Sequence, residues 1–439
     1  MDSSGLWSNH AYTRYWVGRA VSQFGSALSV IAFPLLVLAE GGRATQAGAV
    51  ASCSLITRVV LRLPAGHLAD RVNQRTLMVG MDLIRLAALG SIPVAGLMGW
   101  LSYPQLLVVA LVEGTATALF GPAAAVSFRD LVSKEQLTAA LSRGQATTAT
   151  VSMVGPVAGG ALFGVNTLLP FVVDAGSYLA STLLLLSIRE LSAGGSPRAR
   201  QGGGGDRRMI AGLVWLWRRP TVLRVLLFAS LINLVGSASE LAVLLGLRER
   251  GNTGAVIGLV MACAGIGGIV GSLLAGRFIR MLSPVALCAL VGLVWTAGSV
   301  VLTSVTSAWL IGAVLVGLLL FAPAAGVVLG RITMGEAPRD ILGRVITAEQ
   351  TVTVGLASVG PILVGATLQS IGTAPTWLLL AGVCALSVLL VTSARTSRAR
   401  SKTPHPQDGP DTPDGSGDGP AVATDSPEPV AERAGRAGR

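Results

Sequence analysis

The sequence predicts an all-α membrane protein of twelve transmembrane helices, arranged as two parallel repeats of six. The chain of 439 residues is 51% hydrophobic and only 13% charged, which is more apolar surface than a soluble protein of this size can cover. Apolar runs of about 20 residues, the length that crosses about 30 Å of hydrocarbon as a helix, recur from residue 14 to residue 394. Short patterns in the first half of the chain also return in the second half.

The apolar runs have to be helices, because they lack the alternating pattern of barrel strands and lipid offers the backbone no hydrogen-bond partner. The predicted spans are residues 14–39, 45–64, 76–98, 104–126, 142–165, 168–188, 222–247, 254–279, 284–304, 308–329, 345–370 and 374–394. The first run is too long for the core of a signal peptide, so we expect it to be retained as a helix.

Lysine and arginine gather in alternate loops, and this asymmetry predicts the orientation of the chain. With a cytoplasmic N-terminus, the outer loops hold only Arg43, Arg248 and Arg250 of the 33 basic residues. We therefore expect a multi-pass protein of the plasma (inner) membrane with both termini in the cytoplasm. The predicted segments are an N-terminus (1–13), a first six-helix half (14–190), a cytoplasmic linker (191–220), a second half (221–395) and a disordered tail (396–439).

The two halves repeat each other. Gly121-Pro122 at the end of span four corresponds to Ala322-Pro323 at the end of span ten. Gly155-Pro156 in span five likewise corresponds to Gly360-Pro361 in span eleven. Similar offsets along the chain indicate parallel repeats related by an axis along the membrane normal.

Several other classes of function are disfavoured by the sequence. The net charge of +11 is not gathered on a soluble face of the kind that binds nucleic acid. The glycine run 202–205 lacks the strand before it and the Lys-Ser/Thr after it that a phosphate-binding loop needs. The four cysteines are far apart, and the three histidines form no set with a nucleophile or a metal ligand. We therefore predict no nucleic-acid partner, no cofactor, no metal site and no enzyme activity.

The loop between spans two and three carries the most specific motif. Its residues 66–75, Gly-His-Leu-Ala-Asp-Arg-Val-Asn-Gln-Arg, resemble motif A of the major facilitator superfamily, Gly-x-x-x-Asp-Arg-x-Gly-Arg-Arg/Lys. The resemblance implies a gating motif, with Gly66 at a close helix contact and Asp70, Arg71 and Arg75 in a charge network that holds the inner gate shut. Asn73 stands at a glycine position, where we expect asparagine to tolerate a left-handed backbone.

A second motif lies in span five, where Gly155, Pro156, Gly159 and Gly160 follow a Gly-Pro-x-x-Gly-Gly pattern. This pattern is similar to the core of the motif that marks antiporters of the same superfamily. Small residues let helices pack closely, and proline bends the span. A simple packing seam remains the alternative reading of these residues.

The resemblance covers nearly the whole span-containing chain and is nearest to the branch with macrolide efflux proteins and siderophore exporters. It implies the major facilitator fold and the export of small lipophilic compounds, drug-like, macrolide-like or siderophore-like, by proton antiport with alternating access. Such activity gives multidrug resistance. A proton-coupled importer or a uniporter on the same fold is the alternative, and a scaffold that transports nothing is a remote one.

Acids inside predicted spans are the candidates for proton coupling, since a charge at mid-bilayer costs about 2.5 to 3.5 kcal/mol and is usually functional. Glu113 is near the centre of span four and is the first candidate. Glu240 follows on a polar stripe of span seven with Ser230, Asn233 and Ser237. The further candidates are Asp82 and Glu349.

The resemblance implies that a central cavity is lined mainly by spans one, four, seven and ten. The cavity candidates besides the acids are Gln23, Ser26, Phe33, Thr117, Asn233, Ser237 and Phe321. A cavity with few polar groups and one or two acids suits a lipophilic and cationic compound better than a sugar. The expected partners are this small molecule, protons and the lipid bilayer, and we expect a monomer.

Overall fold

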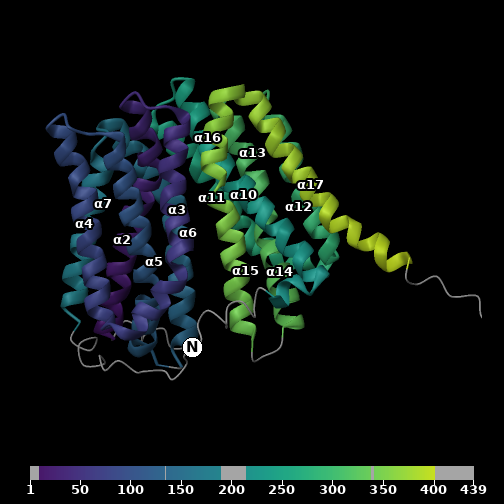
Figure 1. Cartoon of the computed structure of the whole chain (residues 1–439), viewed down its shortest axis with the longest axis horizontal. Helices are drawn as coiled ribbons and strands as arrows, with labels where there is room; N and C mark the ends of the chain where they lie inside the picture. The colour runs from purple at the N-terminus through teal and green to yellow at the C-terminus, as the bar shows by residue number, and fades with distance from the viewer. Residues whose placement is uncertain (1–8, 134, 189–213, 338–340, 401–439) are drawn as a thin grey trace, which may run out of the picture. The chain divides into compact units, whose positions relative to one another are not determined.

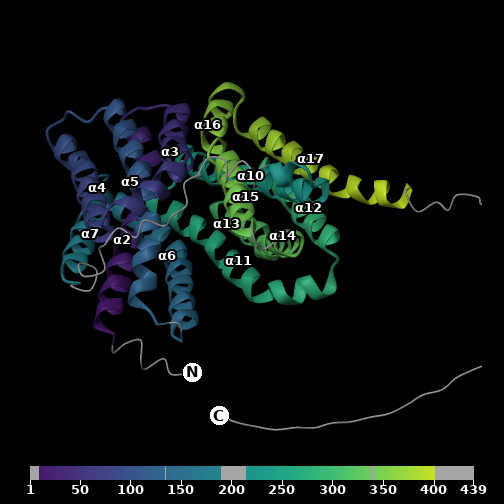
Figure 2. The same ribbon diagram turned by 60° about the horizontal axis from the view of Figure 1, so that its bottom comes forward.

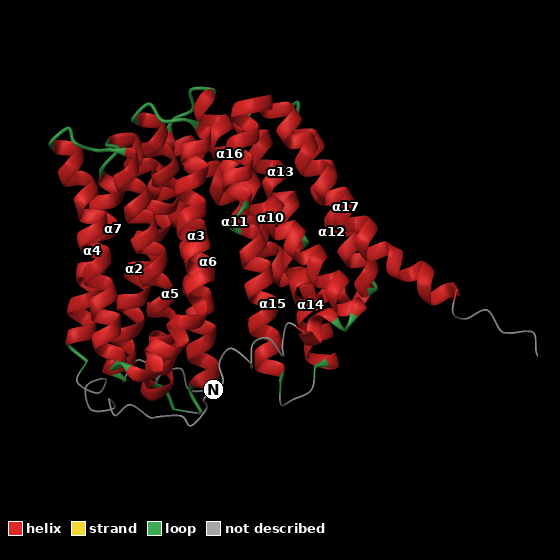
Figure 3. Cartoon of the chain, viewed as in Figure 1, coloured by secondary structure: helices red, strands yellow, loops and turns green. Residues whose placement is uncertain are grey.

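In the computed structural model the described residues, 9–133, 135–188, 214–337 and 341–400, form helices joined by short loops, without a strand (Figures 1 and 3). The first half contains α2 (His10–Ala39), α3 (Ala44–Arg71), α4 (Gln74–Leu97), α5 (Tyr103–Leu131), α6 (Leu137–Val165) and α7 (Leu169–Leu186). The second half contains α10 (Pro220–Glu249), α11 (Gly254–Met281), α12 (Pro284–Leu302), α13 (Ala308–Leu320), α14 (Ala322–Glu336), α15 (Leu342–Ala357), α16 (Gly360–Ile371) and α17 (Thr373–Arg400). Most of the predicted linker and tail lies outside the described residues, so the predicted segment boundaries remain predictions.

The predicted fold class is confirmed, because the described residues include twelve helices long and apolar enough to cross a membrane. Each predicted span overlaps one of them. The largest differences are extensions at the helix ends, where α3 continues to Arg71, α14 to Glu336 and α17 to Arg400. Smaller ones are found where α5 continues to Leu131 and α6 already begins at Leu137. These extra turns carry polar residues such as Arg129 and Asp130, so the apolar run ends before the helical backbone does.

Two spans are interrupted at prolines. The tenth span breaks at Phe321 between α13 and α14, and the eleventh breaks between α15 and α16. Pro323 and Pro361 are the second residues of the helices that follow. A backbone N–H at the start of a helix has no partner within that helix, so the N–H that proline lacks costs no hydrogen bond there. By contrast, α6 runs through Pro156 without interruption.

The helices of each half pack mainly on one another. In the first half α2 packs against α6 and α7, α4 against α5 and α7, and α3 against α5. In the second half α11 packs against α13 and α14, and α10 against α15 and α16. The most extensive contacts between the halves are those of α6 with α11 and of α3 with α16 (Figure 2).

Because the spans alternate in direction, their loops fall at two ends. We call the end with the loop 40–43 the Glu40 end, and the opposite end, from which α2 starts, the linker end. Large apolar side chains remain exposed on the outside of the helices, including Leu183 and Leu389 at 60% or more. A soluble protein seldom exposes so many of them, and in a bilayer these surfaces face lipid.

Candidate transport site

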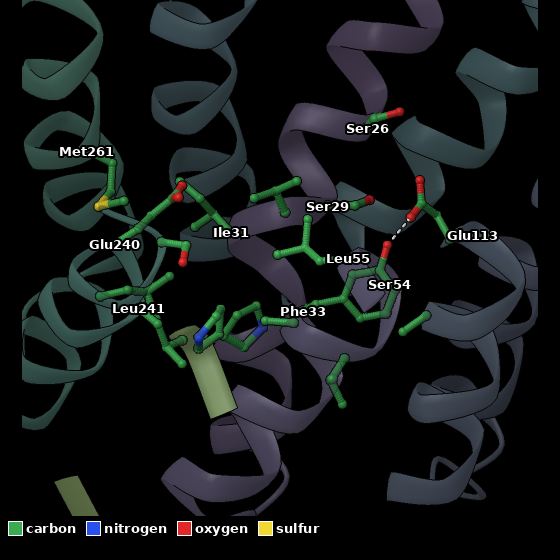
Figure 4. A pocket seen from close by; sticks show the side chains of 18 of the residues that line it. Ser26, Ser29, Ile31, Phe33, Ser54, Leu55, Glu113, Glu240, Leu241 and Met261 are labelled. Carbon is green, nitrogen blue, oxygen red and sulfur yellow. Dashed lines mark hydrogen bonds between the residues drawn. The ribbon is translucent and has the colours of Figure 1, made fainter. Parts of the chain in front are cut away.

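A central cavity of about 180 Å³ lies between the halves, lined by α2, α3, α5 and α7 on one side and by α10, α11 and α16 on the other. Its polar lining residues are Ser26, Ser29, Ser54, Arg58, Glu113, Asp174, Ser237 and Glu240. Figure 4 shows Glu113 and Glu240 on opposite sides, with Ile31, Leu55 and Phe33 between them. The wall is therefore largely apolar, with carboxylates placed at separate points.

A larger cavity of about 1100 Å³ adjoins the central one. Both cavities share Leu55, Ser237, Glu240 and Met261 in their walls. Asn233 lines the larger cavity but not the central one. Glu240 thus lies where the two cavities meet.

Glu113 is held by its neighbours on α3 and α5. Nη2 of Arg58 donates to both carboxylate oxygens, at 2.8 and 3.1 Å. Ser54 Oγ donates to the carboxylate at 2.6 Å, and Thr117 Oγ1 donates at 2.9 Å. Such charge-assisted bonds stabilise the ionised form, so Glu113 joins α3 to α5 by a paired charge.

A second ion pair belongs to the same network. Asp82 is fully buried on α4 and accepts from Nη1 of Arg85 at 3.4 Å and from Ser181 Oγ of α7 at 2.7 Å. Nη2 of Arg85 also donates to Thr117 Oγ1 at 3.0 Å, and Thr117 is bonded to Glu113. Asp82 and Glu113 are therefore linked through one chain of hydrogen bonds across α4 and α5.

Asp174 of α7 is a lining acid that the sequence pattern did not single out. It is 1% exposed, and its carboxylate bonds to hydroxyl groups, chiefly that of Ser29 on α2. The signal that could have found it is the one that selected Glu113, an acid within an apolar run, here between Val173 and Ala175. Asp174 lies near the beginning of the predicted span 168–188, and for this reason it was not among the candidate acids.

Glu240 has no hydrogen bond or ion pair within the part of the chain that the structure describes. Its neighbour on the stripe, Ser237, donates instead to backbone carbonyl oxygens, that of Ala357 at 2.6 Å and that of Leu234 at 3.0 Å. The carboxylate of Glu240 is therefore open to whatever occupies the cavities.

Of the other polar residues of the stripe on α10, one lines a cavity and one is buried between helices. Asn233 lines the larger cavity, whereas Ser230 is buried and donates to Thr353 Oγ1 of α15 at 3.4 Å. Glu349 also lines the larger cavity and accepts from Thr333 Oγ1 of α14 at 2.8 Å. Glu349 thus joins α14 to α15 near the linker end.

Three predicted cavity residues lie elsewhere. Thr117 is part of the ion-pair network and lines neither of the two cavities, and Gln23 lines a separate pocket between α2, α5 and α6 toward the linker end. Phe321 packs on Phe278, with ring centroids 4.9 Å apart. Because Phe321 sits at the break between α13 and α14, the helical register counted along span ten does not hold there.

The loop that resembles motif A joins α3 to α4. Arg75 donates from Nε to the carbonyl oxygen of Leu185 at 3.3 Å and from Nη2 to that of Leu186, at the end of α7. Asn73 accepts at its side-chain oxygen from the backbone N–H groups of Arg75 and Thr76. Its φ is −58°, so asparagine serves here as a helix cap and not as a left-handed residue. The placement of Gly66 and of the side chains of Asp70 and Arg71 lies outside what the structure describes, so their part in the gating motif remains a prediction.

Span five forms a seam between the halves. A Cβ atom added at Gly160 would lie 2.1 Å from the carbonyl oxygen of Gly254 on α11. One added at Gly258 would lie 2.3 Å from the carbonyl oxygen of Pro156. The backbones of α6 and α11 therefore touch, and only glycine permits this approach.

The other two glycines of the motif face α2 within the same half. A Cβ at Gly155 would lie 2.4 Å from the Cβ of Ala27, and one at Gly159 would lie 2.9 Å from the carbonyl oxygen of Leu28. The motif thus packs α6 against two helices at once.

The second half repeats this seam. A Cβ at Gly365 of α16 would lie 2.5 Å from the carbonyl oxygen of Ala44, and one at Gly48 of α3 would lie 2.4 Å from that of Pro361. Gly360 faces α10 as Gly155 faces α2. Two equivalent seams, α6 with α11 and α16 with α3, therefore join the halves toward the Glu40 end.

Metal-binding side chains do not cluster in the described ranges, where no group of three or more His, Cys, Asp or Glu residues could hold an ion. The four cysteines are free thiols: Cys53, Cys263, Cys288 and Cys384. The polar groups of the site are carboxylates, hydroxyl groups and the guanidinium group of Arg58, set in apolar surface.

The chain belongs to the Major Facilitator Superfamily, whose family model matches residues 15–348. This confirms the resemblance seen in the sequence. The chain is accordingly a multi-pass membrane transporter and not an enzyme.

The chain also resembles individual relatives in sequence and individual solved structures in fold. The chain is 26% identical to the multidrug efflux pump Tap of Mycolicibacterium fortuitum over 57% of this chain and 62% of the relative. It is 26% identical to macrolide efflux protein A of Streptococcus pyogenes over 44% of this chain and 48% of that relative. The chain therefore spans less than two thirds of the length of either relative.

The nucleoside transporter NupG has the same fold, with a TM-score of 0.70 at 12% identity over 87% of this chain and 99% of that one. A bacterial homologue of the iron transporter ferroportin in its inward-facing state gives a TM-score of 0.67 at 13% identity over 88% and 98%.

Proposed function

We propose that this transporter exports small lipophilic organic compounds in exchange for protons, by alternating access, as a monomer in the plasma membrane. The observation that carries the proposal is an unpaired carboxylate, Glu240, in the wall of an otherwise largely apolar cavity between the halves. The names of the relatives, a multidrug efflux pump and a macrolide efflux protein, support export and a lipophilic cargo.

The cargo preference follows from the lining. Phe33, Leu244 and Met261 offer apolar contact, and Glu240 offers a charge that nothing else in the described chain neutralises. A cationic group on the cargo would supply the missing partner of Glu240, whereas a sugar would need many more donors and acceptors. Lipophilic cations should therefore bind better than neutral compounds of the same shape.

Alternating access is supported by the position of the two seams. Distribution of basic residues favours cytoplasmic termini, which makes the Glu40 end the outer end. Both seams bring backbones into contact toward that end, and Thr45 of α3 bonds to Gln369 of α16 there. We propose that this is the inward-facing state, and that transport requires the two seams to part.

The remaining predicted coupling acids have partners in this state. Glu113 is paired with Arg58, Asp82 with Arg85, and Glu349 accepts from a threonine. We propose that Glu113 and Asp82 position α3, α4, α5 and α7 around the cavity, and that Glu240 meets the cargo.

Replacing Glu240 by glutamine tests the role of its charge. Transport of a lipophilic cation such as tetraphenylphosphonium should fall about tenfold, equivalent to about 1.4 kcal/mol, because the variant keeps the shape of the side chain and loses the charge. Transport of an uncharged compound of similar size should change less than about twofold. The measurement is initial uptake into inverted membrane vesicles at matched expression.

The control is Glu249→Gln, the same change at an exposed position at the end of α10, which should transport both compounds normally. Equal losses for the cation and the neutral compound in Glu240→Gln, or no loss for either, would show that Glu240 does not recognise cargo charge.

A further inference from the structure

We propose that Asp174 carries the exchanged proton, an inference that rests on the antiport function proposed above. Asp174 is buried on α7 and yet forms part of the wall of the central cavity. Asp82 and Glu113 each have an arginine within ion-pairing distance, whereas no Lys or Arg among the described residues lies within 4.0 Å of Asp174. Of the two acids of this half that line the central cavity, Glu113 and Asp174, Asp174 is the one without an ion pair among the described residues.

The two oxygens of its carboxyl group have different surroundings. Oδ2 accepts a hydrogen bond from Ser29 Oγ at 2.5 Å. Oδ1 lies 3.4 Å from Ser177 Oγ, but that hydroxyl group has a single hydrogen and a nearer acceptor, the backbone carbonyl oxygen of Asp174, at 2.7 Å. Oδ1 therefore has no hydrogen-bond donor of its own. A proton bound to Oδ1 can instead be donated to Ser177 Oγ.

These contacts suit the neutral acid. An ionised carboxylate buried among hydroxyl groups is stabilised far less than one beside an arginine, whereas a protonated carboxyl group completes its hydrogen bonds with Ser29 and Ser177. The same side chain can become ionised when a positive charge enters the cavity that it lines. The proton on Asp174 can therefore be exchanged, whereas Asp82 and Glu113 are held in the ionised form by their arginines.

Glycine at position 25 makes this arrangement possible. A Cβ atom there would lie 2.5 Å from Oδ1 of Asp174 and 2.2 Å from Ser177 Oγ. Any other residue would fill the space that the carboxyl group occupies. Ser29, one turn further along α2, both bonds to Asp174 and lines the central cavity, so its hydroxyl group connects the acid to the cavity.

The surrounding charges support coupling to a cationic cargo. The titratable and charged side chains that face this region from α3, α4, α5 and α7 are Arg58, Asp82, Arg85, Glu113 and Tyr178. Each arginine is already paired with another acid, so this group is neutral overall only when Asp174 is protonated. A cation in the cavity favours ionised Asp174 by attraction, and the released proton passes to water. When the cargo leaves on the other side, Asp174 takes up a proton again, which makes the exchange obligatory.

The test is proton release from the purified protein in weakly buffered detergent, followed with a pH indicator while tetraphenylphosphonium is added. The wild type should release about one proton per cation bound. Asp174→Asn should bind the cation without releasing a proton, because the amide cannot ionise. Asp130→Asn, at an exposed position at the end of α5, should release protons as the wild type does.

The outcomes separate this inference from the function on which it rests. If the wild type binds the cation and releases no proton, proton antiport itself is contradicted. If the wild type and Asp174→Asn release protons equally, antiport stands and Asp174 is not the carrier.

A second measurement uses the wild type alone and so does not depend on the folding of a variant. A hydrophobic carbodiimide, which modifies protonated carboxyl groups in apolar surroundings, should label Asp174, and tetraphenylphosphonium should reduce the labelling several-fold. Absence of label at Asp174, or labelling that the cation does not change, would overturn the inference.

Discussion

Replacing Gly160 by alanine should lower transport by at least about tenfold while leaving membrane insertion and expression close to normal. The added Cβ atom would lie 2.1 Å from the carbonyl oxygen of Gly254 and 2.9 Å from its carbonyl carbon, and a backbone cannot yield as a flexible side chain can. The halves would have to separate along α6 and α11, which disfavours the closed state of the Glu40 end.

The same substitution one turn later provides the control. At Gly164 the nearest atom to an added Cβ, the backbone nitrogen of Ala255, is 4.0 Å away, so Gly164→Ala should transport normally. Gly365→Ala in the equivalent seam should resemble Gly160→Ala, because its Cβ would meet the carbonyl oxygen of Ala44 at 2.5 Å. Initial rates of uptake into inverted vesicles, at matched expression, measure all three. Normal transport by Gly160→Ala would mean that the seam does not take part in the cycle.

Replacing Asp82 by asparagine should lower the free energy of unfolding by about 3 to 5 kcal/mol, the usual effect of leaving one buried charge without its partner. Asp82 is fully buried, and Arg85 is 6% exposed. The guanidinium of Arg85 lies between the rings of Phe120 and Tyr178, 5.2 and 5.1 Å from their centroids, and cannot reach water without disrupting this packing. The effect should be measured by equilibrium unfolding of the purified protein in detergent.

Removing both charges should largely restore stability. The double variant Asp82→Asn with Arg85→Gln leaves no unpaired charge in the helix packing, so it should unfold at a free energy closer to that of the wild type than Asp82→Asn alone. A single variant as stable as the wild type would show that Asp82 and Arg85 do not depend on each other.

The twelve spans could be predicted because the physical cause is local. A helix in lipid must be apolar over about 20 residues and satisfies its own backbone, so the sequence of each span contains its own signal. The ends were less certain where polar turns such as Arg129 and Asp130 prolong α5 beyond the apolar run. The equivalence of Gly155-Pro156 and Gly360-Pro361 was visible too, since it depends on order along the chain.

The partners of the acids could not be predicted in the same way. Arg58 and Glu113 are 55 residues apart, and Ser29 and Asp174 are 145 residues apart, so their contacts depend on how helices pack. The sequence placed Glu113 and Glu240 in the same class of acid, whereas their surroundings differ completely. Packing decides that one is held by arginine and the other is open to the cavity.

The most direct test of the central claim is uphill transport by the wild-type protein in inverted membrane vesicles. With an acidic lumen and the membrane potential collapsed, tetraphenylphosphonium should accumulate in the lumen above its external concentration, and the lumen should lose protons as it does so. A protonophore dissipates the proton gradient independently of the cation, so it should abolish the accumulation, which is driven by about 1.4 kcal/mol for each tenfold difference in proton concentration. Movement of the cation only down its own gradient, movement in the same direction as protons, or uptake no greater than in vesicles without the protein would contradict a proton-driven exporter.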